Sequence, residues 1–237
     1  MARSKNKEAA VGSQNRTVSP NEAKSALTHC IQLQRPIMMW GAPGIGKSDI
    51  VKQIADSEGR EVIDIRLPLW EPTDIKGIPY YNSKENNMVW ASPAELPTDP
   101  KSNAIVFLDE LNSAAPAVQA AAYQLILNRR VGQYHLPEGV SIVAAGNRDS
   151  DKGVTYRMPA PLANRFVHIE LRVDFEDWLQ WATNEHIHAD VVGYCTFAKQ
   201  DLYDFDPKGS SRSFATPRSW SFVSQLLSDD LPESTLT

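Results

Sequence analysis

The stretch GAPGIGKS, residues 41–48, decides the fold class of this chain. It fits the pattern G-x-x-x-x-G-K-[ST], in which glycines let backbone N–H groups turn toward phosphates and the next helix adds its positive end. An apolar run, Ile37–Trp40, precedes the loop as an expected strand, and an amphipathic helix follows it. The residues predicted to hold the phosphates are Gly41, Ala42, Pro43, Gly44, Ile45, Gly46, Lys47 and Ser48. Lys47 would neutralise the β- and γ-phosphates of a nucleotide, and the Ser48 hydroxyl would bind Mg²⁺.

The second half of the site is expected at the ends of neighbouring strands. The run AIVFLDE (104–110) ends in two carboxylates, of which Asp109 would hold Mg²⁺ through water and Glu110 would polarise the attacking water. Asn147 ends the run VSIVAAGN (140–147) and can orient that water by a hydrogen bond. Acidic pairs are also common as plain strand caps, and Gly-Asn is also common in turns. The glycine loop nearby favours a catalytic interpretation of the acidic pair and of Asn147.

Two arginines could supply the positive charge that phosphoryl transfer requires. Arg165, in PLANRF, follows a short helical segment and precedes a strand. Arg218, in TPRSW, lies in the first turn of a helix that Thr216 caps and Pro217 begins. Either arginine alone is more often a surface charge, so the residues by themselves leave the two roles open.

The composition is that of an ordinary globular protein. Of the 237 residues, 42% are hydrophobic and 22% are charged, and no apolar run reaches the length of a membrane span. The net charge of −5 argues against an extended nucleic-acid surface. Cys30 and Cys195 are predicted to be buried free thiols, which places the chain in a reducing compartment, the cytoplasm. His186 and His188 are predicted to lie on a surface helix and not to bind a metal.

The order of the apolar segments divides the chain into three parts. Residues 1–17 are basic and lack an apolar core, so they are predicted to be a disordered tail, with a nucleic-acid arm as the alternative. In residues 18–173 buried strands alternate with helices, which predicts a three-layer αβα fold with a parallel sheet. Residues 174–237 contain no convincing strand and are predicted to form a small helical domain.

The elements expected in the middle part follow from caps and periodicity. A capping box at Ser19 and Glu22 begins the first helix, and Gly59 stops the helix after the phosphate loop. The remaining expected elements are strands at 61–67, 104–110, 140–147 and 165–171 and a helix at 114–129.

Two inserts are predicted to be hairpins. Residues 77–90, GIPYYNSKENNMVW, are apolar at both ends and polar in the middle, as a hairpin requires. Residues 129–140, RRVGQYHLPEGV, have a similar pattern before the strand that ends at Asn147. The alternative is that both are ordinary connecting loops.

The motifs together resemble one family. In order they are GAPGIGKS (41–48), DIKG (74–77), LDELN (108–112), AAGN (144–147), PLANRF (161–166) and TPRSW (216–220). The chain resembles, over residues 18–227, an AAA+ ATPase of the MoxR type, in the branch with dynein-related and midasin-like modules. The resemblance implies a P-loop NTPase core, a helical lid, and a ring, usually hexameric, with ATP and Mg²⁺ bound between subunits.

The resemblance also implies roles for the polar residues. Asn147 becomes the first sensor, Arg218 the second sensor from the lid, and Arg165 the arginine finger offered to a neighbour's nucleotide. Arg129 and Arg130 would also face a subunit interface. Many MoxR proteins have a less standard phosphate loop and a proline after the sensor asparagine, whereas here a full glycine loop is present and Arg148 follows. The chain stops soon after TPRSW, so either a truncated or a compact lid fits.

The function that this resemblance implies is an ATP-driven motor that remodels or activates a partner complex, often with a protein that carries a von Willebrand A-type domain. One alternative is a DNA-acting AAA+ ATPase, which the acidic balance disfavours. Another is a nucleotide-gated scaffold with negligible turnover, which the presence of Glu110, Asn147 and Arg165 disfavours.

Overall fold

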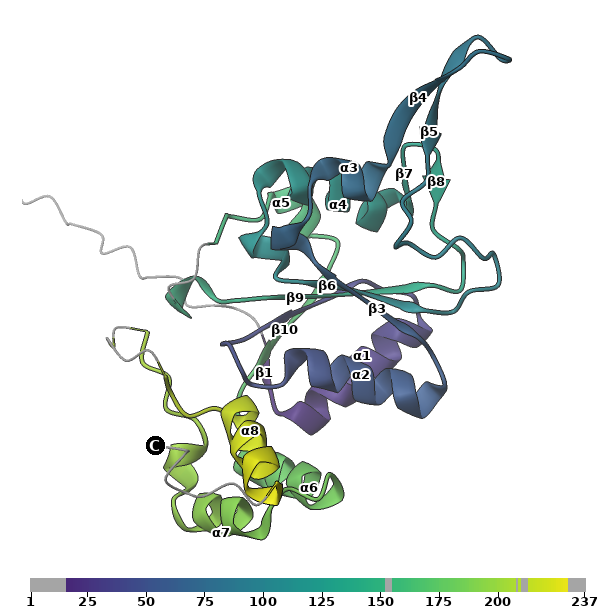
Figure 1. Cartoon of the computed structure of the whole chain (residues 1–237). Coiled ribbons are helices and arrows are strands. Elements are labelled where there is room, and N and C mark those ends of the chain that lie inside the picture. The colour runs from purple at the N-terminus through teal and green to yellow at the C-terminus, as the bar shows by residue number, and fades with distance from the viewer. Residues whose placement is uncertain (1–15, 152–154, 208, 210–212, 230–237) are drawn as a thin grey trace, which may run out of the picture.

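A computed structural model describes residues 16–151, 155–207, 209 and 213–229. A six-stranded parallel sheet in the order β1-β10-β2-β9-β6-β3 forms its centre (Figure 1). The strands are β1 (Arg16–Val18), β2 (Ile37–Trp40), β3 (Val62–Arg66), β6 (Ile105–Asp109), β9 (Ser141–Gly146) and β10 (Val167–Leu171).

Helices cover both faces of this sheet (Figure 1). One face carries α1 (Pro20–Gln32) and α2 (Lys47–Glu58), and the opposite face carries α3 (Pro72–Lys76), α4 (Pro116–Asn128) and α5 (Ala160–Ala163). Side chains alternate along each strand, so Met38 belongs to the core on the α4 side and Met39 to the core on the α1 side. The predicted three-layer αβα fold with a parallel sheet is confirmed.

Local sequence signals explain where the helices begin and end. Ser19 and Glu22 form the predicted capping box at the start of α1, and α2 ends at Gly59 in the left-handed conformation. Short 3-10 turns connect several elements: η1 (Leu67–Leu69), η2 (Leu111–Ser113), η3 (Asp149–Asp151) and η4 (Lys199–Leu202). No helix in the ranges given above has the length and apolar character needed to cross a bilayer.

Both predicted hairpins are present. The longer one pairs β4 (Ile78–Asn82) with β5 (Asn87–Ala91) and projects from the body, and the shorter one pairs β7 (Arg130–Val131) with β8 (Tyr134–His135) (Figure 1). Gly77, at φ +82°, begins the longer hairpin, where a Cβ would lie 1.8 Å from the carbonyl oxygen of Ala91. Only glycine fits where the two strands of the hairpin approach each other this closely.

The C-terminal helices have a small core of their own. They are α6 (Phe175–Asn184), α7 (Ala189–Phe197) and α8 (Pro217–Ser228). Their shared buried cluster consists of Trp178, Ala182, Val191, Cys195 and Leu202. The predicted helical character of this region is therefore present in its described residues, and the last eight positions, 230–237, lie outside them.

Three expectations from the sequence need correction. Arg16 and Thr17, assigned to the tail, belong to β1, because their backbone pairs with β10; positions 1–15 lie outside the described residues. Cys30 is only partly buried, since it lies at the margin of the apolar face of α1. His186 has a φ of 54° and lies between helices, and His188 is the N-cap of α7. The two histidines thus flank a helix start and do not lie within a helix.

Candidate functional site

The candidate site lies at the carboxyl edge of the central strands. Trp40 at the end of β2 is paired with Gly146 at the end of β9, and Leu108 of neighbouring β6 is paired with Ala144. The phosphate loop, the carboxylate pair and Asn147 directly follow these strand ends. Residues from three separate motifs therefore meet at one edge, which is where open α/β sheets bind ligands.

Lys47 is the central cation of the site. Its Nζ donates hydrogen bonds to the carbonyl oxygens of Gly41 (2.7 Å) and Ala42 (2.9 Å) and to Oδ1 of Asn147 (3.3 Å). Burial lowers the pKa of Lys47 to about 8, against the attraction of Asp109 and Asp151, which raises it. The ammonium therefore lies among oxygen acceptors, as a phosphate-binding lysine should.

The phosphate loop has the backbone conformation that the pattern requires. Gly44 and Gly46 have φ angles of 75° and 91°, and Gly46 is the N-cap of α2. Lys47 and Ser48 form the first turn of that helix, whose free N–H groups favour an anion. The loop thus fits the phosphates of a nucleotide.

The two carboxylates take different positions. Asp109 is partly buried at the end of β6, and its Oδ1 accepts a hydrogen bond from the backbone N–H of Glu110 (2.9 Å). Glu110 is exposed and has a left-handed φ of 54°. Ser48 and Asp109 offer the hard oxygen ligands that Mg²⁺ prefers. Within the described ranges no group of three or more His, Cys, Asp or Glu residues could hold a metal.

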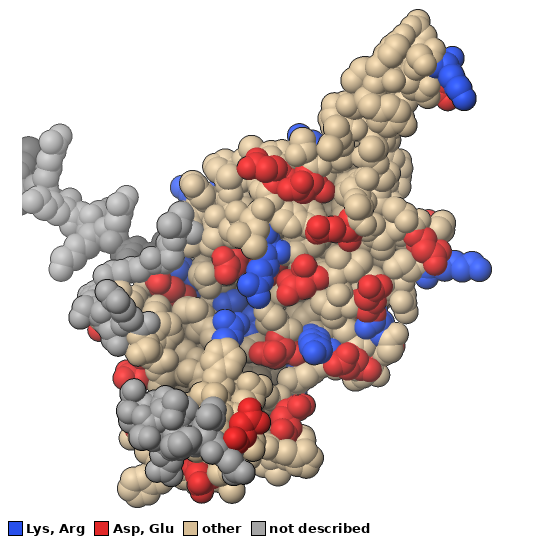
Figure 2. Space-filling view, in the orientation of Figure 1, with Lys and Arg blue, Asp and Glu red and all other residues tan. Residues whose placement is uncertain are grey.

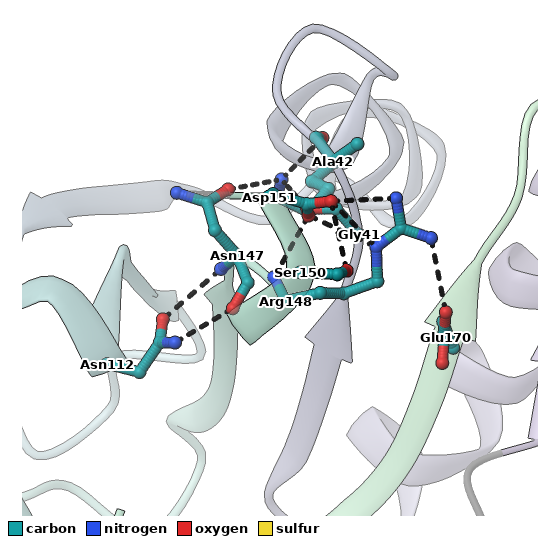
Figure 3. Close-up of polar contacts among 9 residues, drawn as sticks. Gly41, Ala42, Asn112, Asn147, Arg148, Ser150, Asp151 and Glu170 are labelled. Atoms are coloured by element: carbon teal, nitrogen blue, oxygen red, sulfur yellow. Dashed lines mark hydrogen bonds and ion pairs between the residues drawn. The ribbon is translucent and has the colours of Figure 1, made fainter. Parts of the chain in front are cut away.

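Asn112 holds Asn147 in place, a role that the sequence analysis missed. Its Nδ2 donates to the backbone oxygen of Asn147 (2.8 Å), and its Oδ1 accepts from the backbone N–H of Asn147 (3.2 Å) (Figure 3). Asn112 is only 2% exposed. The motif LDELN contains this residue, but nothing local in the sequence shows that its side chain is buried against Asn147.

Arg148 forms a second polar network beside the site. Its guanidinium contacts Asp151 (2.9 Å) and Glu170 of β10 (3.3 Å) (Figure 3). The hydrogen bond with buried Asp151 is the main cause of the raised pKa of Arg148. In the sequence this arginine was only a departure from the family pattern; in the structure it joins the segment after Asn147 to β10.

The helical region touches the phosphate loop directly. The backbone N–H of Arg218, in the first turn of α8, donates to the carbonyl oxygen of Gly44 (3.2 Å). A Cβ on Gly44 would lie 2.8 Å from Oγ1 of Thr216, so this glycine allows α8 to approach. The positive charge of Arg218 lowers the pKa of Lys47, which places the two cations at the same site.

A pocket opens between the core and the helical region, next to the phosphate loop. It lies between the first turns of α1 and α2 on one side and α6 and α8 on the other. Among its lining residues are Ile45, Gly46, Val173, Trp178, Trp181 and Arg218. Its largely apolar wall suits a flat aromatic group.

Arg165 lies away from the other predicted residues. It precedes β10, whose first residue, Val167, is paired with Ile37 at the start of β2. The phosphate loop begins at the other end of β2, and a strand of four residues spans about 13 Å. Arg165 is exposed, and it makes no ion pair with any residue in the described part of the chain. It therefore faces outward at the amino edge of the sheet.

Arg129 does not fit the interface role implied by the resemblance. It has a left-handed φ of 52°, and its guanidinium donates to the carbonyl oxygens of Pro137 (2.7 Å), Glu138 (3.3 Å) and Val140 (2.7 Å). Burial lowers its pKa. Arg129 is thus used inside the chain, where it closes the shorter hairpin, whereas Arg130 is exposed.

The fold and these contacts define a nucleotide-binding domain of the P-loop class. The chain belongs to the ATPase family associated with various cellular activities (AAA), whose family model matches residues 36–168. This match, together with the midasin relatives, confirms the resemblance to the MoxR and midasin branch.

The relatives are much longer than this chain. Midasin of Giardia intestinalis is 29% identical over 175 residues, which are 68% of this chain and 4% of midasin. Midasin of Dictyostelium discoideum is 25% identical over 167 residues, which are 64% of this chain and 3% of midasin. A mutant of RuvB from Thermotoga maritima has a TM-score of 0.56 at 18% identity, over 89% of this chain and 62% of the RuvB chain, and is similar in fold alone.

Proposed function

We propose that this chain is an ATP-hydrolysing, Mg²⁺-dependent motor subunit that works in a ring and remodels or activates a partner protein complex. The observation that carries the proposal is the division of the site between two edges of the sheet. Lys47, Glu110 and Asn147 meet at the carboxyl edge, whereas Arg165 lies exposed at the amino edge. A site divided in this way is completed by a second copy of the chain.

Each residue at the carboxyl edge has a chemical task in this proposal. The N–H groups of the glycine loop and Lys47 bind the phosphates, and Ser48 with Asp109 would hold Mg²⁺. When bound, Mg²⁺ neutralises charge on the phosphate oxygens. Glu110, exposed beside Asp109, polarises the attacking water. Asn147, fixed by Asn112, orients that water.

The pocket beside the phosphate loop would take the nucleobase. The apolar rings of Trp178 and Trp181 offer contact area to a planar base, and Ile45 continues this apolar wall toward the loop. Because α6 and α8 form part of the pocket, the helical region would follow the nucleotide when it binds and leaves. This would convert the nucleotide state into movement of a domain.

The longer hairpin is the surface that we assign to a neighbouring subunit or a client. Ile78, Tyr81 and Met88 are 64%, 60% and 56% exposed. The hairpin is largely uncharged apart from its tip (Figure 2). Apolar residues gathered on a projecting arm are typical of a protein-binding surface. A protein with a von Willebrand A-type domain is the partner that the family resemblance suggests, and free thiols at Cys30 and Cys195 suit the cytoplasm.

Two variants test the chemistry. Lys47→Ala removes the charge facing the phosphates, so ATP binding should be lost. Glu110→Gln should bind ATP but lose turnover, because an amide cannot polarise water as a carboxylate does. Equilibrium binding of a fluorescent ATP analogue, measured beside phosphate release, separates the two effects; an equal loss of affinity in both variants would contradict the assignment.

The Glu110→Gln variant also tests the biological role. It should hold ATP and a client longer than the wild-type chain does, so a pull-down with it, and with Lys47→Ala as control, should enrich a client protein. Tight ATP binding with no turnover by the wild-type chain at any concentration would favour a nucleotide-gated scaffold. A salt-dependent shift of DNA would favour a DNA-acting ATPase.

A further inference from the structure

His168 of β10 bridges two segments that are far apart in sequence. The indole Nε1 of Trp40 donates a hydrogen bond to Nδ1 of His168 (2.9 Å), and Nε2 of His168 lies 2.7 Å from the carbonyl oxygen of Ala163. Because the indole can only donate and the carbonyl can only accept, the ring must be neutral with its proton on Nε2. The Trp40 and His168 rings also stack, with an interplanar angle of 11°.

The two ends of this bridge lie at the two halves of the divided site. Trp40 is the last residue of β2 and directly precedes Gly41, whose carbonyl oxygen accepts from Lys47. Ala163 is the last residue of α5 and lies two positions before Arg165. One imidazole therefore connects the start of the phosphate loop with the loop that carries the exposed arginine.

We propose that His168 is a positioning residue for Arg165, an inference that rests on the proposed function. Local backbone bonds shape the turn around Arg165, from Arg165 N to Leu162 O (3.0 Å) and from Phe166 N to Ala163 O (3.2 Å). The turn is anchored on both sides, because Leu162 and Phe166 are buried in the core and Val167 N donates to the carbonyl oxygen of Pro36 before β2 (2.9 Å). The bond from His168 to Ala163 adds a side-chain tie between β10 and the chain just before Arg165, and it fixes the direction in which Arg165 leaves the surface toward a neighbour's nucleotide.

A purely structural role would have different consequences. The bridge would then contribute only to folding stability, and its loss would lower the stability of every variant without a specific effect on the neighbour's turnover. A positioning role predicts that the bond with Ala163 matters for turnover in the neighbour, whereas the bond with Trp40 matters less. Replacing His168 with Gln or Asn tests the two hydrogen bonds separately, because each amide side chain can keep one of them. The amide nitrogen of Gln is separated from the backbone by the same number of bonds as Nε2 of His168, so Gln keeps a donor for Ala163. The amide oxygen of Asn is separated from the backbone by the same number of bonds as Nδ1, so Asn keeps an acceptor for Trp40.

The experiment uses mixed rings, so that His168 is changed only in a chain that cannot hydrolyse ATP. The donor chain carries Lys47→Ala, which leaves Arg165 in place but should not bind nucleotide. The acceptor chain carries Arg165→Ala and has an intact phosphate loop. Three further donors add His168→Gln, His168→Asn or His168→Phe to Lys47→Ala. Turnover by the acceptor then reports on the position of the donor's Arg165 alone.

We expect the donor with His168→Gln to support turnover within about threefold of the donor with His168 intact. The donors with Asn or Phe should lower kcat by at least about tenfold with little change in KM, because a finger acts on the transition state and is worth 10³–10⁵ in rate. Thermal stability and co-assembly of each donor are measured in parallel. If Phe fails to fold, the Gln and Asn donors still decide.

Three results would contradict the proposal, and they can be told apart. If the donor with His168 intact restores turnover and the Asn and Phe donors restore it equally well, His168 does not position Arg165 and only this inference is wrong. If the donor with His168 intact restores nothing despite co-assembly, the shared site is wrong and the role of His168 is wrong with it. If the loss of turnover across the donors is proportional to their loss of thermal stability, the positioning role is also wrong.

Discussion

At the scale of single residues, Lys47 controls the charge of the phosphate loop. Burial lowers its pKa to about 8, below the usual value of 10.5, while Asp109 and Asp151 act in the opposite direction. A bound phosphate stabilises the protonated form and raises that pKa again. Binding must therefore take up a proton once the pH exceeds about 8.

This coupling predicts that the affinity for ATP falls as the pH rises. Lys47 is largely protonated at pH 7 and largely neutral at pH 9, so the dissociation constant should rise about tenfold over this interval. Binding isotherms from pH 6 to pH 9.5 measure the effect. Lys47→Arg keeps its charge and serves as the control, which should lack this dependence. A dissociation constant of the wild-type chain that is flat from pH 7 to pH 9 would show that Lys47 keeps its proton throughout.

Asn112 gives a second prediction at this scale. Asn112→Ala removes both bonds to the backbone of Asn147 and leaves buried groups unpaired, which should cost about 1–3 kcal/mol in the free energy of unfolding. The sensor should also shift, so turnover should fall by about 10²-fold while ATP still binds. Urea denaturation and phosphate release measure the two effects, with exposed Asn184→Ala as control. Unchanged turnover would mean that Asn147 needs no such support.

Single residues also show where sequence reasoning reaches its limit. The positions of Lys47, Asp109, Glu110 and Asn147 in the fold could be predicted because each directly follows or forms a motif at a strand end. Asn112 could not be assigned, because its importance comes from a contact 35 positions away. The roles of Arg148 and Arg129 likewise depend on partners brought near by the fold: a carboxylate on β10 and three carbonyl oxygens in the shorter hairpin.

At the scale of elements, most helices and strands could be predicted because their signals are local. Capping residues marked the start of α1 and α8, and helical spacing marked the buried side of α4. Strand β1 was missed because it has three residues, too few for a periodic pattern, and exists only through its pairing with β10. Its burial depends on tertiary contact, which no local signal reports.

The longer hairpin supplies the prediction at this scale. Its base is anchored, since the backbone N–H of Trp90 donates to Oε1 of Gln133 in the shorter hairpin (3.2 Å), whereas its turn is exposed. Replacing Ser83–Asn87 with a shorter turn should therefore leave thermal stability and ATP affinity unchanged but alter assembly or stimulation by a client. A variant with Tyr80→Ser and Tyr81→Ser tests the apolar surface at full length.

Thermal denaturation, nucleotide binding and sedimentation are the measurements for both hairpin variants. A collapse of thermal stability in the shortened variant would mean that the arm belongs to the core. Unchanged assembly and unchanged client response in both variants would mean that the arm binds neither a neighbour nor a client.

At the scale of the whole molecule, the sheet separates the residues proposed to bind nucleotide from Arg165, the arginine proposed to complete a neighbour's site. The parallel pairing of β10 with β2 places Arg165 at the amino edge and Gly41 at the carboxyl edge. The edge on which Arg165 lies follows from a parallel sheet and an arginine that precedes a strand, whereas its role toward a neighbour was implied only by the family resemblance. Turnover per chain should consequently rise with protein concentration as rings form.

Mixing two inactive variants tests this division of the site most directly. Arg165→Ala should bind ATP but lack the proposed finger, and Lys47→Ala should not bind ATP but keep Arg165. Phosphate release is measured for each variant alone and for the mixture, after co-assembly has been shown by sedimentation. We expect turnover in the mixture well above that of either variant, because some interfaces combine an intact phosphate loop with an intact Arg165. No recovery in co-assembled mixtures would contradict it and would mean that Arg165 does not complete the site of a neighbour.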